Sequence, residues 1–214
     1  MVALGGLAQS GSGTPAGSAN QLASHSQAVQ LYLVAILMDW ALLYYCWMGV
    51  HRAGGGLATL SGARWNSWKA LAADVAITIP FWGLWEGAAY AVHWLLGPST
   101  AKTVDALLPQ SVVEVLLWVF TSITAGICEE LSFRGYVQRQ FRALTGSVAV
   151  AVLAQGAVFG LFHLYQGWKN TVVISVLGVL YGVLAVWRGN LRANVLAHAW
   201  SDIWEGWLKF VVWR

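Results

Sequence analysis

Ionisable side chains lie in three short segments in the second half of this chain, and each segment is flanked by apolar residues. The groups that could do chemistry are Glu129, Glu130 and Arg134 in the first segment, His163 in the second, and Asn194, His198 and Asp202 in the third. A carboxylate and a histidine that meet can take a proton from water, and nearby donors can stabilise a developing oxyanion. If the three segments converge in the fold, this chemistry is that of peptide hydrolysis.

The first segment predicts separate tasks for two adjacent carboxylates. On a helix Glu130 and Arg134 are four residues apart, so they share a face and can form an ion pair. Glu129 lies about 100° away around the helix axis, where it is free to face a cavity and do acid–base work. The alternative interpretation is an ordinary helix end with exposed charges.

The second and third segments each contain an imidazole that a neighbouring residue could orient. His163 follows an apolar run, and Phe159 lies one helical turn earlier, where its ring can pack beside the imidazole. Asn194, His198 and Asp202 are spaced four apart, so a helix presents them as one stripe. The alternatives are a structural histidine at position 163 and a ladder of hydrogen bonds between packed helices at the stripe.

The ordered set resembles the CAAX-protease-and-bacteriocin-processing family of intramembrane endopeptidases, also called the CPBP or Abi family, which includes the type II CAAX prenyl proteases. The matching motifs are Glu129-Glu130-x-x-x-Arg134, Phe159-x-x-x-His163 and His198-x-x-x-Asp202, and they define a protease-like core at about residues 110–205. The resemblance implies that this core hydrolyses a peptide bond of a membrane-associated protein or peptide.

The resemblance also implies roles for the individual residues. Glu129 and His163 would activate a water, while His198 and Asp202 would stabilise the oxyanion. The family's prenyl-protein proteases carry Asn at the last of these positions. Because an ionised Asp cannot donate a hydrogen bond, Asp202 acts here either in its protonated form or by orienting His198. The residues expected to support the site are Glu130, Arg134, Phe159 and Asn194.

Neither a metal nor another cofactor is expected at this site. The sequence lacks the His-Glu-x-x-His motif of zinc proteases, and the resemblance favours a metal-independent glutamate mechanism. A divalent metal such as zinc is the alternative, and its ligands would be Glu129, His163, His198 and Asp202. Cys128, which precedes the two carboxylates, is interpreted as a buried small residue rather than as a nucleophile.

The composition predicts a multi-pass protein of the cell membrane. Hydrophobic residues make up 58% of the chain and charged residues 10%, whereas soluble domains carry about 25% charged residues. The 14 tryptophans agree with this, since tryptophan is favoured at membrane–water interfaces. The basic residues are scattered rather than clustered, so the expected partners are the lipid bilayer and a peptide or protein substrate, and nucleic acid is not expected.

Residues 1–26 are rich in Gly, Ser, Ala and Gln and contain no Lys or Arg, which predicts a disordered tail. Residues 27–214 are expected to form one all-α transmembrane bundle with about six spans, near 27–50, 69–96, 109–128, 147–164, 171–188 and 191–213. Basic residues concentrate in the first, third and fifth loops, which predicts that these loops face the cytoplasm. Residues 132–145 are expected to form an amphipathic helix that lies at this interface or leaves the third span.

Four further ionisable residues lie in apolar spans without a recognisable motif: Asp39, Asp74, Glu86 and His93. They are expected to pair between the first two helices or to line an access path. Two other classes of function stay open from the residues. One is a non-catalytic bacteriocin-immunity or membrane scaffolding protein of the same fold, and the other is a proton-coupled transporter that uses these groups as a relay.

Overall fold

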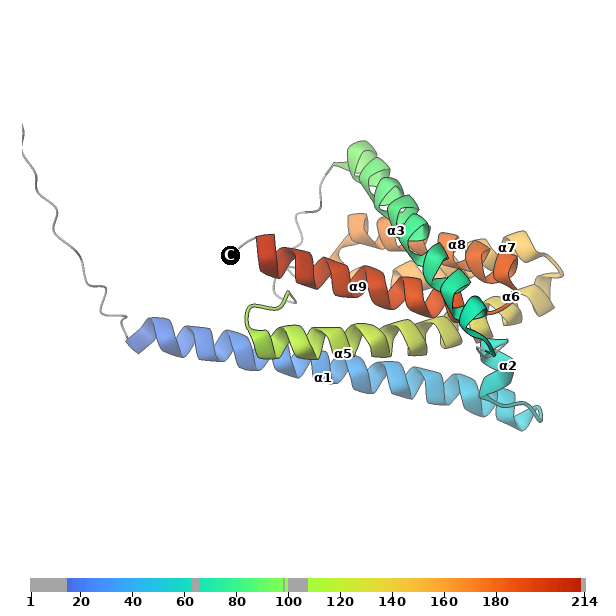
Figure 1. Cartoon of the computed structure of the whole chain (residues 1–214), viewed down its shortest axis with the longest axis horizontal. Helices are drawn as coiled ribbons and strands as arrows, with labels where there is room; N and C mark the ends of the chain where they lie inside the picture. Colours follow the sequence, from blue (N-terminus) through green and yellow to red (C-terminus); the bar gives the residue numbers. More distant parts are fainter. Residues whose placement is uncertain (1–14, 63–65, 98, 100–107, 213–214) are drawn as a thin grey trace, which may run out of the picture.

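The computed structural model describes residues 15–62, 66–97, 99 and 108–212, and within these ranges the chain forms helices and no strand. The predicted all-α fold is therefore confirmed. α5 (Val112–Glu129) lies between α1 (Pro15–Arg52) and α9 (Arg192–Val212), as Figure 1 shows. α7 (Val148–Phe162) and α8 (Trp168–Arg188) pack against each other, and α3 (Trp68–Leu96) crosses α8 and α9 obliquely.

Three helical stretches are long and apolar enough to cross a membrane: Gln27–Arg52, Val112–Thr145 and Trp168–Arg188. α7 is also apolar but shorter. The chain is therefore a membrane protein by the length and composition of its helices. The expected number of about six spans stays a prediction.

The third predicted span continues well beyond its expected end at residue 128. α5 runs without a break into η1 (Glu130–Val137), a π-helical segment, and then into α6 (Gln138–Thr145). Of the two arrangements expected for residues 132–145, the structure shows the one in which this segment leaves the third span as its continuation. Single π-helical segments inside longer helices occur frequently at functional sites.

Local sequence signals set the ends of the helices that carry the polar segments. Ser111 and Ser147 begin α5 and α7, and each side chain accepts a hydrogen bond from the backbone N–H three residues later. Gly146 and Gly189 end α6 and α8 with φ of 69° and 64°, a conformation that glycine adopts without strain. Short caps of this kind place one helix directly after another, so distant polar residues can meet.

Glycines bring the polar helices into close contact. A Cβ added at Gly126 of α5 would lie 2.9 Å from the backbone nitrogen of Ala199 in α9. At Gly178 of α8, an added Cβ would lie 2.8 Å from the Cα of Gly156 in α7. Small residues at such positions let membrane helices approach closely. The approach of α5 to α9 sets the carboxylates at the end of α5 beside the polar stripe of α9.

α1 begins at Pro15, which lies inside the predicted tail at residues 1–26. Residues 1–14 lie outside the described residues, so the disorder expected for that part of the tail stays a prediction, whereas residues 15–26 belong to α1. α2 (Leu57–Ser61) follows α1, and Gly62 caps its C-terminal end.

The first, third and fifth loops lie together at one end of the molecule, as the distribution of basic residues predicts. Arg139 of α6 donates to the carbonyl oxygens of Thr59 and Leu60 in α2. At the same end, Asp74 of α3 lies 2.7 Å from Arg188 and 2.9 Å from Arg192, in an ion-pair cluster around the turn between α8 and α9. The cytoplasmic location of this end remains a prediction.

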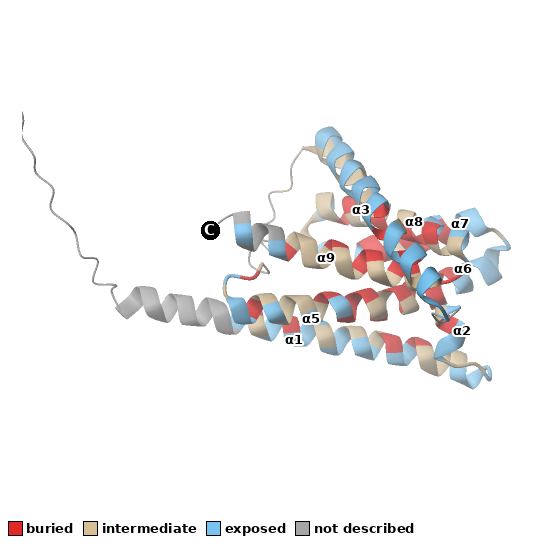
Figure 2. Cartoon of the chain, in the orientation of Figure 1, coloured by how far each residue is buried: buried red, intermediate tan, exposed pale blue. Residues whose placement is uncertain are grey.

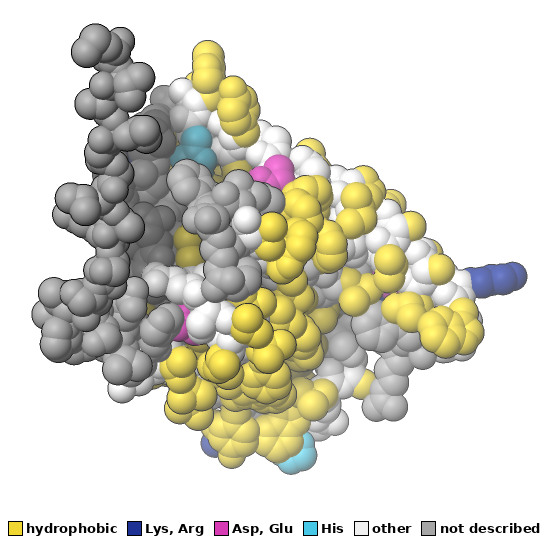
Figure 3. Space-filling view, turned by 60° about the vertical axis from the view of Figure 1, so that its left-hand side comes forward, with side chains coloured by type: hydrophobic (Ala, Val, Ile, Leu, Met, Phe, Trp, Pro, Cys, Tyr) yellow, Lys and Arg dark blue, Asp and Glu magenta, His cyan; other side chains and the backbone are white. Residues whose placement is uncertain are grey.

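Burial separates the inside of the bundle from its outer face. Figure 2 shows buried residues concentrated where α5, α8 and α9 meet, whereas much of α3 is exposed. The exposed side chains of α3 include Leu84, Tyr90 and Trp94, and Figure 3 shows large hydrophobic areas on one face. An apolar outer surface around a polar interior is the arrangement that a lipid environment favours.

Candidate active site

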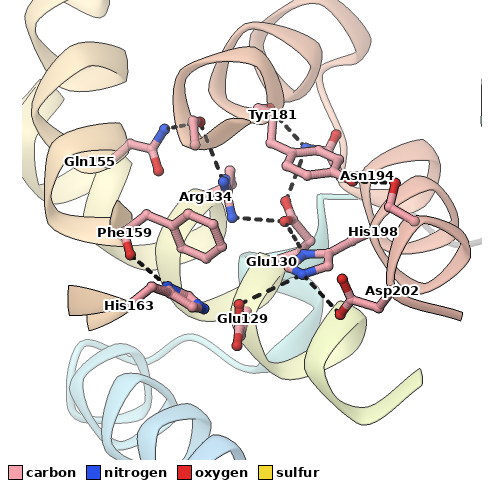
Figure 4. Close-up of polar contacts among 12 residues, drawn as sticks. Glu129, Glu130, Arg134, Gln155, Phe159, His163, Tyr181, Asn194, His198 and Asp202 are labelled. Carbon is pink, nitrogen blue, oxygen red and sulfur yellow. Dashed lines mark hydrogen bonds and ion pairs between the residues drawn. The ribbon is translucent and has the colours of Figure 1, made fainter. Parts of the chain in front are cut away.

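Glu130 is the centre of a hydrogen-bonded cluster that joins η1 to α9. Its Oε1 accepts hydrogen bonds from Arg134 Nη1 at 2.7 Å and from His198 Nδ1 at 2.8 Å, and its Oε2 accepts from Asn194 Nδ2 at 3.0 Å (Figure 4). The carboxylate is fully buried. The ion pair predicted between Glu130 and Arg134 is therefore present, and the structure adds two partners from α9 that the local spacing does not reveal.

Arg134 is held on several sides inside the bundle. Its guanidinium lies 4.2 Å from the ring centroid of Phe159 and 5.1 Å from that of Tyr181, and Nη2 donates to the carbonyl oxygen of Gly178 at 3.3 Å. A cation over aromatic faces is stabilised by the ring quadrupole, most strongly where water is excluded. Arg134 therefore fixes the position of Glu130 and links η1 to α7 and α8.

The ring of His198 has a defined orientation. A carboxylate only accepts, so Nδ1 carries a proton and donates it to Glu130. Nε2 then points toward Glu129 Oε2 at 3.7 Å and Asp202 Oδ2 at 3.6 Å, and the ring stacks on Tyr181 with a centroid distance of 5.2 Å. A neutral ring and two ionised carboxylates would place only acceptors at this point. A proton on Nε2, Glu129 or Asp202 would relieve this clustering of acceptors.

Glu129 differs from its neighbour Glu130 in its surroundings. Its side chain is 14% exposed, and Oε2 is buried without a hydrogen bond to any described residue. The predicted division of the two carboxylates agrees with this geometry, because one is fully engaged by donors and the other faces His198 without a hydrogen bond. A buried carboxylate oxygen without a donor is costly, and in proteins such groups occur mainly at functional sites.

His163 caps the end of α7, where it is half-buried beside Phe159. Its Nδ1 lies 2.9 Å from the carbonyl oxygen of Phe159, and the two ring centroids are 5.0 Å apart, so the predicted packing of these rings is present. A carbonyl oxygen only accepts, so Nδ1 donates, and in the neutral ring Nε2 is left as a base. Figure 4 shows His163 at the end of α7 and Glu129 at the end of α5.

Three residues outside the predicted set also contribute to the cluster. Tyr181 stacks on His198, and Gln155 Nε2 donates to Gly178 at 2.7 Å, the carbonyl that Arg134 also contacts. Asp39 of α1 is half-buried and interacts electrostatically with Glu129, His198 and Asp202. Gln155 could have been found as a polar residue in an apolar helix, whereas Tyr181 gives no such signal.

The spacing of Asp39 did contain a usable signal. The buried residues Tyr32, Leu43 and Cys46 lie seven residues before it and four and seven residues after it. This heptad-like spacing places Asp39 on the side of α1 that packs against α5. Of the other residues without a motif, Asp74 pairs with the arginines described above, and Glu86 accepts a hydrogen bond from Trp82 in its own helix.

The alternative metal-binding set does not form a ligand cluster in this structure. Among the residues that the structure describes, no three His, Cys, Asp or Glu side chains are arranged to hold a metal ion. One nitrogen of each histidine already has an oxygen partner, since His198 Nδ1 bonds Glu130 and His163 Nδ1 bonds a backbone carbonyl. The expected metal-independent mechanism stays a prediction. Cys128 is fully buried and packs in a core cluster with Leu43 and Leu60.

Membrane-length apolar helices around a buried cluster of carboxylates and histidines define an all-α membrane protein with the groups of a hydrolase. A family model described as type II CAAX prenyl endopeptidase Rce1-like matches residues 111–204, which include every predicted site residue. The predicted resemblance to this family is therefore confirmed over residues 111–204. This match supports a CAAX-type intramembrane protease at the family level. Comparison with curated proteins and with solved structures gives no match.

Proposed function

We propose that this chain is an endopeptidase of the cell membrane that cleaves a membrane-associated protein or peptide with a water activated by Glu129 and His163. The observation that carries the proposal is the buried Glu129 oxygen, which has no hydrogen bond to a described residue and lies 3.7 Å from His198 Nε2. The hydrogen bond to Glu130 and the stacking on Tyr181 hold the His198 ring in place. A carboxylate in this position is suited to accept a proton from water.

In the attack step, the Glu129 carboxylate takes the proton of the water whose oxygen adds to the scissile carbonyl. His163 contributes Nε2 as a second acceptor, because its Nδ1 proton is engaged by the carbonyl oxygen of Phe159. The new C–O bond converts the carbonyl into a tetrahedral oxyanion. The proton held by Glu129 then passes to the leaving nitrogen as the C–N bond breaks.

The oxyanion is stabilised by the proton that the cluster shares next to His198. When this proton lies on Nε2, the imidazolium donates to the oxyanion, and Asp202 orients the ring from 3.6 Å. When it lies on Asp202, the carboxylic acid is the donor. Both arrangements depend on Glu130, which fixes the opposite nitrogen of the ring.

Comparing the peptides of isolated membranes tests this function. Membranes with the wild-type chain should contain cleavage products that are absent with Glu129→Gln, as measured by mass spectrometry of new peptide termini. Glu86→Gln is the matched control, because Glu86 is an exposed carboxylate of α3. It should give the wild-type products. Identical peptide sets for wild type and Glu129→Gln would favour the non-catalytic immunity or scaffolding protein instead.

A further inference from the structure

A cavity lies apart from the polar cluster, between the end of α1, α2 and the junction of η1 with α6. Its volume is about 380 Å³, and the side chains that shape it include Val50, Thr59, Leu60, Tyr136 and Arg139. None of the proposed catalytic residues lines it. Cavities of this size are large enough for a small ligand or a headgroup.

Close backbone contacts build the walls of this cavity. A Cβ added at Gly49 of α1 would lie 2.7 Å from the hydroxyl oxygen of Tyr136, and one added at Gly135 would lie 2.9 Å from the carbonyl oxygen of Leu60. α1 and α2 therefore pack directly on η1 at this point. The cavity is a feature of packed helices rather than of a single loop.

The cavity lies near the ends of two candidate membrane spans. The candidate span Gln27–Arg52 ends beside it, and the candidate span Val112–Thr145 passes it within its last turns. Two helices from different parts of the chain thus place it at the same depth. Lipid headgroups occupy this zone.

The charge of the cavity is positive and has no acidic counterpart nearby in the sequence. Arg139 lines it and bonds only neutral carbonyl oxygens, those of Thr59 and Leu60, and it makes no ion pair with any described residue. The two carbonyls hold the guanidinium in a fixed place. The two segments that line the cavity, within residues 40–73 and 131–201, contain no Asp or Glu. They also contain further basic residues, such as Arg52 and Arg142.

We infer that this cavity binds the phosphate of an anionic phospholipid headgroup. Arg139 supplies the charge, and the Tyr136 hydroxyl and the Gln140 amide, which also line the cavity, supply further donors to phosphate oxygens. Basic pockets between membrane helices bind anionic headgroups in this way. A bound lipid would join α1 and α2 to η1, the helix segment that carries Glu130 and Arg134. The inference is independent of the proposed protease function.

The binding of phosphatidylglycerol by the purified full chain tests the inference, with phosphatidylcholine as the neutral comparison. Thermal unfolding in neutral detergent and lipid retention in native mass spectrometry are the two measurements. Phosphatidylglycerol should raise the melting temperature and stay bound, whereas phosphatidylcholine should not. Arg139→Gln should bind phosphatidylglycerol roughly tenfold more weakly, the loss expected for one charge-assisted contact.

Arg142→Gln is the matched control, because Arg142 lies on the same helix, is exposed and does not line the cavity. Arg142→Gln should bind as the wild type does. Arg139→Lys is a second variant for the case in which Arg139→Gln fails to fold. Because it keeps the charge, it should retain most of the affinity. An equal loss in Arg139→Gln and Arg142→Gln would overturn the inference, as would equal binding of both lipids. Stabilisation by glycerol phosphate alone would overturn the assignment to a lipid.

Discussion

Two ionic clusters of this protein differ in how their charges are paired. At the end with the basic loops, one carboxylate, Asp74, meets two guanidiniums, and each of its oxygens lies within 2.9 Å of an arginine nitrogen. In the middle of the bundle, Glu129, Glu130 and Asp202 surround one imidazole, and only Glu130 also has an arginine. In the first cluster every charged group has a partner of opposite charge, as in a structural ion pair. The second keeps carboxylate oxygens unpaired, which is expected where protons must move.

The largest loss of stability is expected for Glu130→Gln. This change leaves the buried Arg134 without its carboxylate, and breaking a buried ion pair costs about 3–5 kcal/mol. The free energy of unfolding should fall by this amount in denaturant titrations of the purified protein, and activity should be lost with it. Glu86→Gln serves as the control and should unfold as the wild type does. A Glu130→Gln protein with unchanged stability would remove the structural role assigned to this carboxylate.

A smaller loss of stability, about 1–3 kcal/mol, is expected for Asp74→Asn. The amide keeps hydrogen-bonding groups near the arginines but removes the charge, and the Arg188 side chain is 24% exposed, so water can compensate in part. The cleavage rate per folded molecule should not change, because this cluster does not contact the proposed site. If the rate per folded molecule fell strongly, the division into a structural and a functional cluster would be wrong.

A still smaller effect is expected for Asp39→Asn. Its carboxylate acts on Glu129, His198 and Asp202 through space from a half-buried position. Such an interaction contributes about 0.5–1 kcal/mol, or a two- to fivefold fall in kcat/KM with little change in melting temperature. Asp39→Glu should restore much of the rate. Wild-type kinetics in Asp39→Asn would show that α1 takes no part in the site.

No effect is expected from removing divalent metals, because the carboxylates and histidines can act on water directly. Cleavage rates measured before and after treatment with a chelator should agree, and added zinc should not raise them. Loss of cleavage on chelation, followed by recovery on adding zinc, would establish the metal-dependent alternative.

The sequence predicts those features that depend on local spacing. The pair Glu130 and Arg134, the stripe containing His198 and the packing of Phe159 on His163 follow from helical periodicity, and all three are present. The hydrogen bond from His198 to Glu130 joins residues far apart in the chain, and the partners of Asp74 are equally distant. Contacts of this kind depend on how whole helices pack.

The course of the third helix could not be predicted for a different reason. A π-helical segment changes the hydrogen-bond pattern from four residues to five, and no residue type at 130–137 signals this change. The predicted end of the span at residue 128 was placed where the apolar run ends. The end of an apolar run marks a change in polarity and not the end of a helix. The helix itself continues to Thr145, because buried partners satisfy the polar residues that follow.

The central claim is that Glu129 does chemistry and Glu130 holds the structure, and the most direct test is to measure melting temperature and cleavage rate on the same preparations of both glutamine variants. Glu129→Gln keeps the side-chain shape but removes its charge and basicity. It should melt near the wild-type temperature and lose cleavage by about 10²–10⁴-fold, the usual contribution of a general base. Glu130→Gln should instead lose stability. A well-folded Glu129→Gln protein that cleaves at a near wild-type rate would contradict the claim.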